Sequence, residues 1–341
     1  MDLDTFLTTL YVLVDDWYKQ ASALEKPQMG GARPRMSDSE LLTVAVAGQW
    51  RKGVPWSSER GVVRYMQTQG RGWFPQMVGR SDFNARVRRL WGGLIRLQQV
   101  VADALATPSD VYECVDCLPL PAYTLGQALR ESHHWLNEST LGTGGNQQGW
   151  YWGDKWLVAV APSGAITGWL VGTAQMNDRW LLEGLLTARA GQPQLVGPGP
   201  NPHESRRHRA QVPRAGHLGG WAAVGRATAA AYLADRGFNG ERWRKHWQRQ
   251  AQAEVVTIPP ANAPLFQTWC RADALWHAHH RQNIETAFTL LDGVFEVKQL
   301  AAHSRWGQYT RLAAKAAAYN IGLFINRLLG RPSGALKTLL C

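Results

Sequence analysis

Apolar residues recur at three- and four-residue intervals through 1–107, and this spacing predicts an all-helical region. The first helix is expected over Leu3–Lys19, where Leu7, Leu10 and Val14 share one face. A Gly- and Pro-rich break follows at 27–35.

Serine residues mark the expected starts of three further helices in this region. Ser37 and Glu40 have the spacing of a capping box, in which each side chain accepts a hydrogen bond from the other's backbone. The expected spans run from Ser37 to about Trp50, from Ser57 or Ser58 to about Gln69, and, with Ser81 as the cap, from Asp82 to about Leu105.

From Val111 the pattern changes to that of strands. Val111–Pro121 reads as a short buried strand that its prolines end. Trp150–Ala161 and Ile166–Gly172 flank a Pro-Ser-Gly turn signal at 162–164, so they predict a hairpin.

Helices and strands alternate in the remainder of the chain. A stretch of about 30 residues at 191–220 is rich in Gly, Pro and Arg, and we expect either a DNA-contacting arm or an insertion there. The expected elements are helices over Arg179–Arg189, Glu241–Gln252, Trp276–Leu291 and Trp306–Leu329, and strands over Ala230–Ala234 and Glu254–Ile258. This order predicts an α/β core behind a helical N-terminal part. The expected domains are 1–107, 108–330 and a tail at 331–341.

The net charge of the chain indicates which class of partner it binds. A net charge of +11 and a pI of about 9.8 favour a polyanion, either nucleic acid or a membrane surface. No stretch reaches the ~18 apolar residues of a membrane span, and the acidic N-terminus is unlike a signal peptide. Four cysteines in 341 residues favour a reducing compartment. We therefore expect a cytoplasmic nucleic-acid-binding protein.

Two clusters of metal-binding residue types have simpler interpretations. Cys114 and Cys117 form one CxxC without the second pair that a structural zinc site needs, so core packing is expected. His277, His279 and His280 adjoin an arginine on a predicted helix, and we expect them beside DNA or in solvent.

Arginines concentrate at two places. Arg86, Arg88, Arg89 and Arg96 lie on the predicted helix that ends near Leu105. They fit a DNA-binding module or, equally, a helical bundle with a solvated basic face. The expected DNA contacts are Arg86 and Arg89 here, and Arg206, Arg207 and Arg209 in the 191–220 loop.

Three carboxylates occupy comparable places in the α/β core. Asp116 lies in an apolar strand, Asp235 ends a second strand, and Glu285 lies on a late helix. Two divalent cations held by such carboxylates about 3.5–4 Å apart can activate water and stabilise the leaving oxygen in a phosphoryl transfer. The alternative is three unrelated acids that cap turns or pair with arginines.

The segments around these acids resemble those of bacterial insertion-sequence DDE transposases, over about residues 35–330. Val115-Asp116 resembles the first-Asp strand, and Arg281-x-x-x-Glu285 matches the core of the C-terminal motif. The chain departs from the family where a Tyr and a Lys are usual, with Ala278 and Asp292. Further similar segments are Tyr151-Trp152-Gly153-Asp154-Lys155, Met176-Asn177-Asp178, Leu233-Ala234-Asp235-Arg236-Gly237-Phe238 and the last helix, with Arg311, Lys315, Asn320, Asn326 and Arg327.

The resemblance implies a ribonuclease H-like mixed sheet flanked by helices. It further implies that Asp116, Asp235 and Glu285 are catalytic and hold two Mg²⁺ ions, for which Mn²⁺ can substitute. Lys155 and Arg281 would then contact DNA. Asp178 is either a further residue of this site or a helix N-cap, and we favour the cap.

The implied function is DNA transposition. The protein would bind the terminal inverted repeats of its element, cut the strand at each end and join it to target DNA, as a homodimer or a larger assembly on the nucleoid. The alternatives are a ribonuclease H-like nuclease that does not join, and a non-catalytic DNA-binding regulator derived from a transposase.

Overall fold

A computed structural model describes the chain except for residues 23–33, 125–138, 144–148, 191–221, 225–230, 260–268, 301, 303 and 341. The chain divides into two compact units. We call Met1–Leu105 with Leu290–Cys341 the helical unit, and Ala106–Thr289 the sheet unit. The loop expected at 191–220, with Arg206, Arg207 and Arg209, lies outside the described residues.

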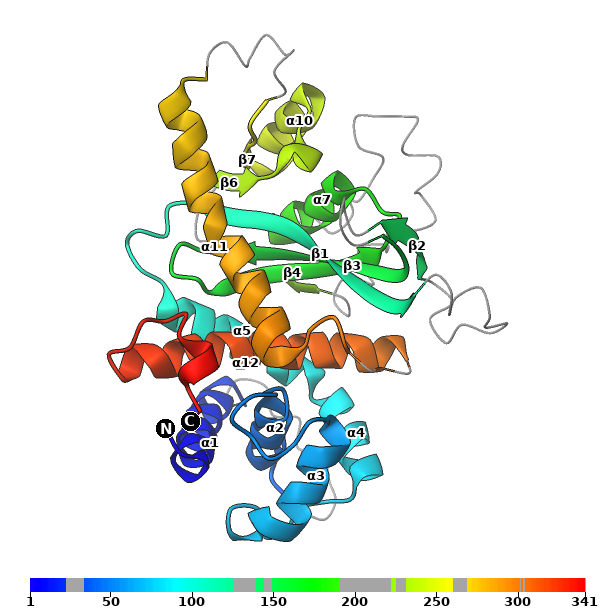
Figure 1. Ribbon diagram of the computed structural model, residues 1–341, viewed down its shortest axis with the longest axis vertical. Coiled ribbons are helices and arrows are strands. Elements are labelled where there is room, and N and C mark those ends of the chain that lie inside the picture. Colours follow the sequence, from blue (N-terminus) through cyan, green and yellow to red (C-terminus); the bar gives the residue numbers. More distant parts are fainter. Residues whose placement is uncertain are drawn as a thin grey trace. The chain divides into compact units, whose positions relative to one another are not determined.

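Capping determines where helices of the helical unit begin. The capping box of Ser37 and Glu40 is present, and the Ser58 side chain accepts a hydrogen bond from the Gly61 backbone, so both predicted starts are confirmed. The helices are α1 (Leu3–Ser22), α2 (Asp38–Ala47), α3 (Glu59–Thr68), α4 (Arg80–Arg89), α5 (Trp91–Leu105) and α12 (Arg305–Leu328), with 3-10 turns at Gln69–Gly72 and Leu336–Thr338 (Figure 1).

The single helix predicted up to Leu105 is wrong. It is two helices, α4 and α5, separated at Leu90. The glycines at 92 and 93 favour an interruption, because glycine is a poor helix former. The predicted cap is also wrong, because the N-cap of α4 is Gly79 and no side chain caps the helix.

The last helix belongs to the helical unit. We expected 290–330 in one domain with the sheet, whereas α12 lies in the same compact unit as α5 and α2 and packs against both. Its alanine-rich faces are buried and permit close helix packing. The expected tail at 331–341 contributes Leu336 and Leu339 to the same core.

A seven-stranded mixed sheet forms the centre of the sheet unit, with strand order β5-β4-β3-β1-β6-β7 and β2 paired to β3. The predicted hairpin is confirmed as the antiparallel pair of β3 and β4. The strands are β1 (Glu113–Thr124), β2 (Thr140–Thr143), β3 (Trp150–Val160), β4 (Ile166–Thr173), β5 (Ala222–Val224), β6 (Ala231–Ala234) and β7 (Glu254–Val256).

The first strand is longer than predicted. Pro119 and Pro121 do not end β1, which continues to Thr124 in an antiparallel pair with β3. Proline is tolerated where its missing N–H is not needed by a neighbouring strand. The only other described neighbour of β1 is β6, which pairs with it no further than Val115.

The helices of the sheet unit lie against opposite faces of β1. Val115 packs in one core with α7 (Asp178–Arg189) and α10 (Glu241–Ala251). Cys114 and Asp116 point the other way, because side chains alternate along a strand, and both bond to α11 (Arg271–Phe295). Figure 1 shows α11 running past the sheet. The fold is therefore a mixed α/β sheet flanked by helices.

None of the helices in the described part of the chain combines the length and the apolar character that crossing a membrane requires.

Candidate active site

The register of the sheet brings the first two acidic residues together. Val115 of β1 is the parallel partner of Ala234 of β6, so Asp116 and Asp235 each follow one residue later on adjacent strands, at the carboxyl end of β6. The carboxyl ends of parallel strands are where α/β proteins most often bind ligands. The two residues are 119 positions apart in the sequence, and only strand pairing makes them neighbours.

The chain turns sharply after Asp235 and holds this carboxylate in place. Its Oδ1 accepts a hydrogen bond of 2.8 Å from the Gly237 backbone, at the start of a 3-10 turn over Arg236–Phe238. A Cβ at Gly237 would lie 3.0 Å from Asp235 Oδ1 and 3.6 Å from Asp178 Oδ2. The Gly237 backbone therefore approaches both carboxylates, at a distance where a side chain would be tight.

Asp178 is part of this cluster and is not a helix cap, which corrects our prediction. The cap of α7 is Asn177, whose Oδ1 accepts from the Arg179 backbone. Asp178 instead accepts a hydrogen bond of 2.9 Å from Lys155 Nζ. Lys155, predicted to contact DNA, thus neutralises an acid beside Asp235 and donates also to the Met176 carbonyl, at 3.3 Å.

Arg281 connects the cluster to the third predicted acid. Its Nη2 lies 3.0 Å from Asp116 Oδ2 and 3.8 Å from Glu285 Oε1. Arg281 and Glu285 are one turn apart on α11, so both face the same side of the helix. The Glu285 side chain is 62% exposed, against 22% for Asp116. Glu285 is therefore held at the edge of the cluster by a cation.

The electrostatics of the cluster oppose a charge on Asp116. Burial and the nearby carboxylates of Asp235 and Asp178 raise the pKa of Asp116 to about 6, against the stabilising effects of Arg281 and the Cys117 backbone N–H. A carboxylate kept ionised among others at neutral pH attracts a further cation. Strong perturbation of this kind is typical of functional sites.

The carboxylate oxygens of this cluster are the type of ligand that a hard divalent cation binds. Their side chains are not arranged around a common metal position among the described residues. Asp116 and Asp235 offer carboxylate oxygens, the ligands that Mg²⁺ prefers. Within the described ranges, no group of three or more His, Cys, Asp or Glu side chains is arranged to hold a metal ion. Glu285 would have to turn away from Arg281 to join the two aspartates, and its exposure leaves room for that.

His277 and the cysteines of the CxxC, Cys114 and Cys117, have structural roles, whereas His279 is exposed. His277 is buried, which corrects the prediction of a solvated or DNA-proximal residue, and its Nε2 lies 3.2 Å from the Val256 carbonyl oxygen. Cys114 is buried as predicted, and burial raises the pKa of its thiol to about 12. Burial likewise raises the pKa of Cys117. Neutral thiols are poor metal ligands.

The two arginines of the helical unit that were predicted to contact DNA differ in their environment. Arg86 donates to the Met36 carbonyl at 2.9 Å and to Asp38 Oδ1 at 3.1 Å, so it contributes to the internal structure of the helical unit. Arg89 is exposed, and no partner for it occurs in the part of the chain that the structure describes. Of this pair, only Arg89 is free to contact a ligand.

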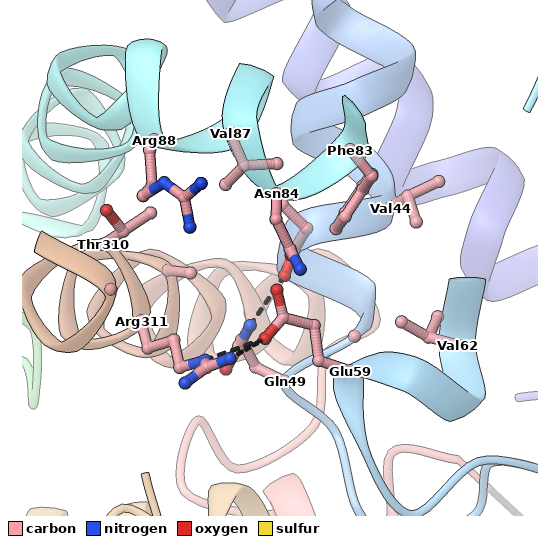
Figure 2. Close-up of a pocket in the computed structure, with 14 residues that line it drawn as sticks. Val44, Gln49, Glu59, Val62, Phe83, Asn84, Val87, Arg88, Thr310 and Arg311 are labelled. Atoms are coloured by element: carbon pink, nitrogen blue, oxygen red, sulfur yellow. Dashed lines mark hydrogen bonds and ion pairs between the residues drawn. The ribbon is translucent and has the colours of Figure 1, made fainter. Parts of the chain in front are cut away.

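The helical unit has a cavity of its own, lined from α2, α3, α4 and α12. Its volume is about 50 Å³, which suits a few water molecules, each needing roughly 10–15 Å³ on the same measure. Figure 2 shows Glu59 and Arg311 joined across it, and the buried Asn84 Oδ1 has no partner there. This cavity is too small to be a substrate site.

Two features that bear on function were not predicted from the sequence. The pairing of Asp178 with Lys155 depends on the antiparallel register of β3 and β4, although both residues lie in segments that resemble transposase motifs. The second feature is a basic groove beside α10, for which the only signal was the charge of the predicted helix.

Comparisons with family models, with curated proteins and with solved structures found no match to this chain.

Proposed function

We propose that the chain is a metal-dependent DNA transposase of the DDE type, with Asp116, Asp235 and Glu285 as its catalytic carboxylates. The observation that carries this proposal is the placement of Asp116 and Asp235 side by side on adjacent parallel strands, where burial and then repulsion from Asp235 raise the pKa of Asp116 to about 6. Folding brings together two like charges that stability alone disfavours. Such an arrangement is expected where a cation or a reaction requires it.

The topology of the sheet unit supports the ribonuclease H-like core that this proposal needs. Three consecutive antiparallel strands, β1, β3 and β4, form one half of the sheet. On the other side of β1, β6 and β7 run parallel to it, and α10 connects them. The net charge of +11 supports a polyanionic substrate.

Each residue of the cluster has a distinct proposed role. Asp116, Asp235 and Glu285 would hold two Mg²⁺ or Mn²⁺ ions, which when bound would supply a nucleophilic water and stabilise the leaving oxygen. Arg281 positions Asp116 and Glu285 and would be free to contact a phosphate once they hold the ions. Lys155 keeps Asp178 paired and limits the negative charge around Asp235.

The substrate and setting follow from the same proposal. The protein would bind the terminal inverted repeats of its element and a target duplex, as a homodimer or larger assembly in the bacterial cytoplasm, on the nucleoid. A nuclease that cuts without joining is the nearest alternative, and a non-catalytic DNA-binding regulator is the other.

Incubation of purified protein with a plasmid that carries its coding sequence and flanking DNA tests the proposal. We expect strand cleavage that requires Mg²⁺ or Mn²⁺, and joined products once a target plasmid is added. Asp116→Asn and Asp235→Asn should each abolish cleavage, whereas Asp103→Asn, an exposed acid on α5, should leave it intact. Cleavage without joining would favour the nuclease, and DNA binding without cleavage in either metal would overturn the proposal in favour of the regulator.

A thermal melt of the same variants provides an independent check. Asp116→Asn removes a carboxylate that its surroundings disfavour, so in metal-free buffer at neutral pH we expect it to stabilise the protein by about 1–3 kcal/mol. Adding Mg²⁺ should stabilise the wild type and not this variant. Asp103→Asn should stay within about 0.5 kcal/mol of the wild type in both conditions. Destabilisation by Asp116→Asn would show that the carboxylate is structural.

A further inference from the structure

An open groove of about 470 Å³ lies in the sheet unit between α10 and β7, an edge strand of the sheet. Figure 1 shows the two elements beside each other. Arg244, Lys245, Gln248 and Arg249 line it from the helix. Glu254 lines the groove from β7, and Trp269 also belongs to its lining.

The groove is basic because the helix that lines it is basic. Arg242, Arg244, Lys245 and Arg249 against Glu241 give α10 a charge of +3 with its histidine neutral. Lys245 is paired with Glu241 at 2.7 Å on the exposed surface. Arg244 and Arg249 have no ion-pair or hydrogen-bond partner among the residues that the structure describes, so their charges are available to a ligand.

The spacing of the cations fits a nucleic-acid backbone. A helix rises about 1.5 Å per residue, so Arg244 and Arg249 are about 7.5 Å apart along the helix axis. A DNA strand carries one phosphate per about 3.4 Å of duplex axis. The two arginines are therefore separated by about two phosphate intervals, and each can neutralise a different phosphate of one strand. Among the lining residues that the structure describes, Trp269 is the one aromatic side chain, and one ring is no platform for successive stacked bases, which favours duplex over single-stranded DNA.

The groove also adjoins the carboxylate cluster. Val256, in its lining, is the parallel partner of Leu233, two residues before Asp235. Thr257, also in the lining, donates a hydrogen bond of 3.4 Å to Asn239, which follows the turn after Asp235. A duplex with a phosphate at the carboxylates can thus continue into the groove.

We propose that the groove between α10 and β7 binds the phosphate backbone of duplex DNA next to the carboxylate cluster, through Arg244 and Arg249. This inference rests on the proposed function in that it takes DNA as the substrate. It adds a contact surface that is separate from the reacting groups, and it can fail or hold whether or not the protein cuts DNA.

The salt dependence of duplex binding tests the groove. Each lost phosphate contact reduces the magnitude of the negative slope of log K against log salt concentration by about 0.9. We therefore expect Arg249→Gln to reduce this magnitude by about 1 and the double variant Arg244→Gln with Arg249→Gln by about 2, in fluorescence anisotropy with a labelled duplex of arbitrary sequence. The matched control is Arg242→Gln, because Arg242 is exposed on the same helix and does not line the groove.

The outcomes separate this inference from the proposed function. Equal slopes for Arg249→Gln and Arg242→Gln would overturn the proposal that the groove binds DNA and would leave the cleavage test unaffected. A loss confined to a single-stranded probe, or no binding of the duplex by the wild type, would also overturn it. The loss of cleavage in Asp116→Asn tests the catalytic proposal alone. Circular dichroism melts of the variants at Arg242, Arg244 and Arg249 should match the wild type, since these side chains face solvent or the open groove.

Discussion

At the scale of single residues, burial decides which charged groups are costly. Asp116 and Lys315 are both ionisable groups in environments that disfavour their charge. Asp116 is buried close to the carboxylates of Asp235 and Asp178, which is consistent with its place in a proposed catalytic site. Lys315 is fully buried in the helical unit and is not part of the proposed catalytic site.

Lys315 is the clearest pH-sensitive group of the helical unit. Its Nζ donates to the Phe295 carbonyl, and it is otherwise buried in α12. Burial, with Arg51 and Arg311, lowers the pKa of Lys315 from 10.5 to about 7, against the opposite effects of Glu296 and Glu59. Between these two values the unfolded chain holds a proton that the folded protein lacks. Folding is therefore favoured increasingly as the pH rises from about 7 toward 10.5.

Replacing this lysine should remove that pH dependence. We expect Lys315→Met to raise the free energy of unfolding near pH 7 by about 1–4 kcal/mol, because an apolar side chain of similar length replaces a buried cation. The gain should shrink as the pH approaches about 10. Urea unfolding at several pH values measures both effects. Lys52→Met, at an exposed lysine, should leave the pH curve unchanged, and parallel curves for Lys315→Met and the wild type would contradict the assignment.

At the scale of elements, local sequence predicted most helices and strands but not all of their limits. The capping box of Ser37 and the N-cap of Ser58 are as predicted, because these signals act over three residues of chain. The predicted end of β1 was wrong because the end of this strand depends on its neighbour. Pairing with β3 extends β1 beyond Pro121 to Thr124. Short strands such as β2 and β5 carried no recognisable local pattern.

Two of the serines predicted as caps in the helical unit provide a matched test. Ser37→Ala removes one half of the capping box of α2, so we expect a loss of about 0.5–2 kcal/mol in the free energy of unfolding. Ser81→Ala should have almost no effect, because the N-cap of α4 is Gly79. Chemical denaturation of both variants against the wild type gives the comparison. A larger loss for Ser81→Ala than for Ser37→Ala would contradict the observed capping.

At the scale of the whole chain, the helical unit is assembled from both ends of the sequence. Residues 1–107 were expected to form a domain, whereas α5 packs against α12 within one compact unit. Leu94, Leu97 and Val101 of α5 are buried in that unit. Removing α12 would expose much of their apolar surface, at a cost of roughly 25 cal/mol per Å².

A fragment test follows from this division. We expect residues 1–107 alone to lack a cooperative thermal transition by circular dichroism. The same fragment joined by a flexible linker to 290–341 should regain one, because it then contains every described residue of the helical unit's core. A cooperative melt of 1–107 alone would show that the N-terminal helices fold without α12.

The sequence by itself determined the elements whose signals are local, the basic character of the chain and the three acids worth examining. Apolar spacing and capping act within a few residues, so they are legible without tertiary structure. The tertiary structure decided which of these acids meet. Strand register brings Asp116 and Asp235 together, Arg281 holds Glu285 at their edge, and the packing of α7 on β3 and β4 adds Asp178. These relations join residues far apart in the chain, and only cooperative burial of a shared core establishes them.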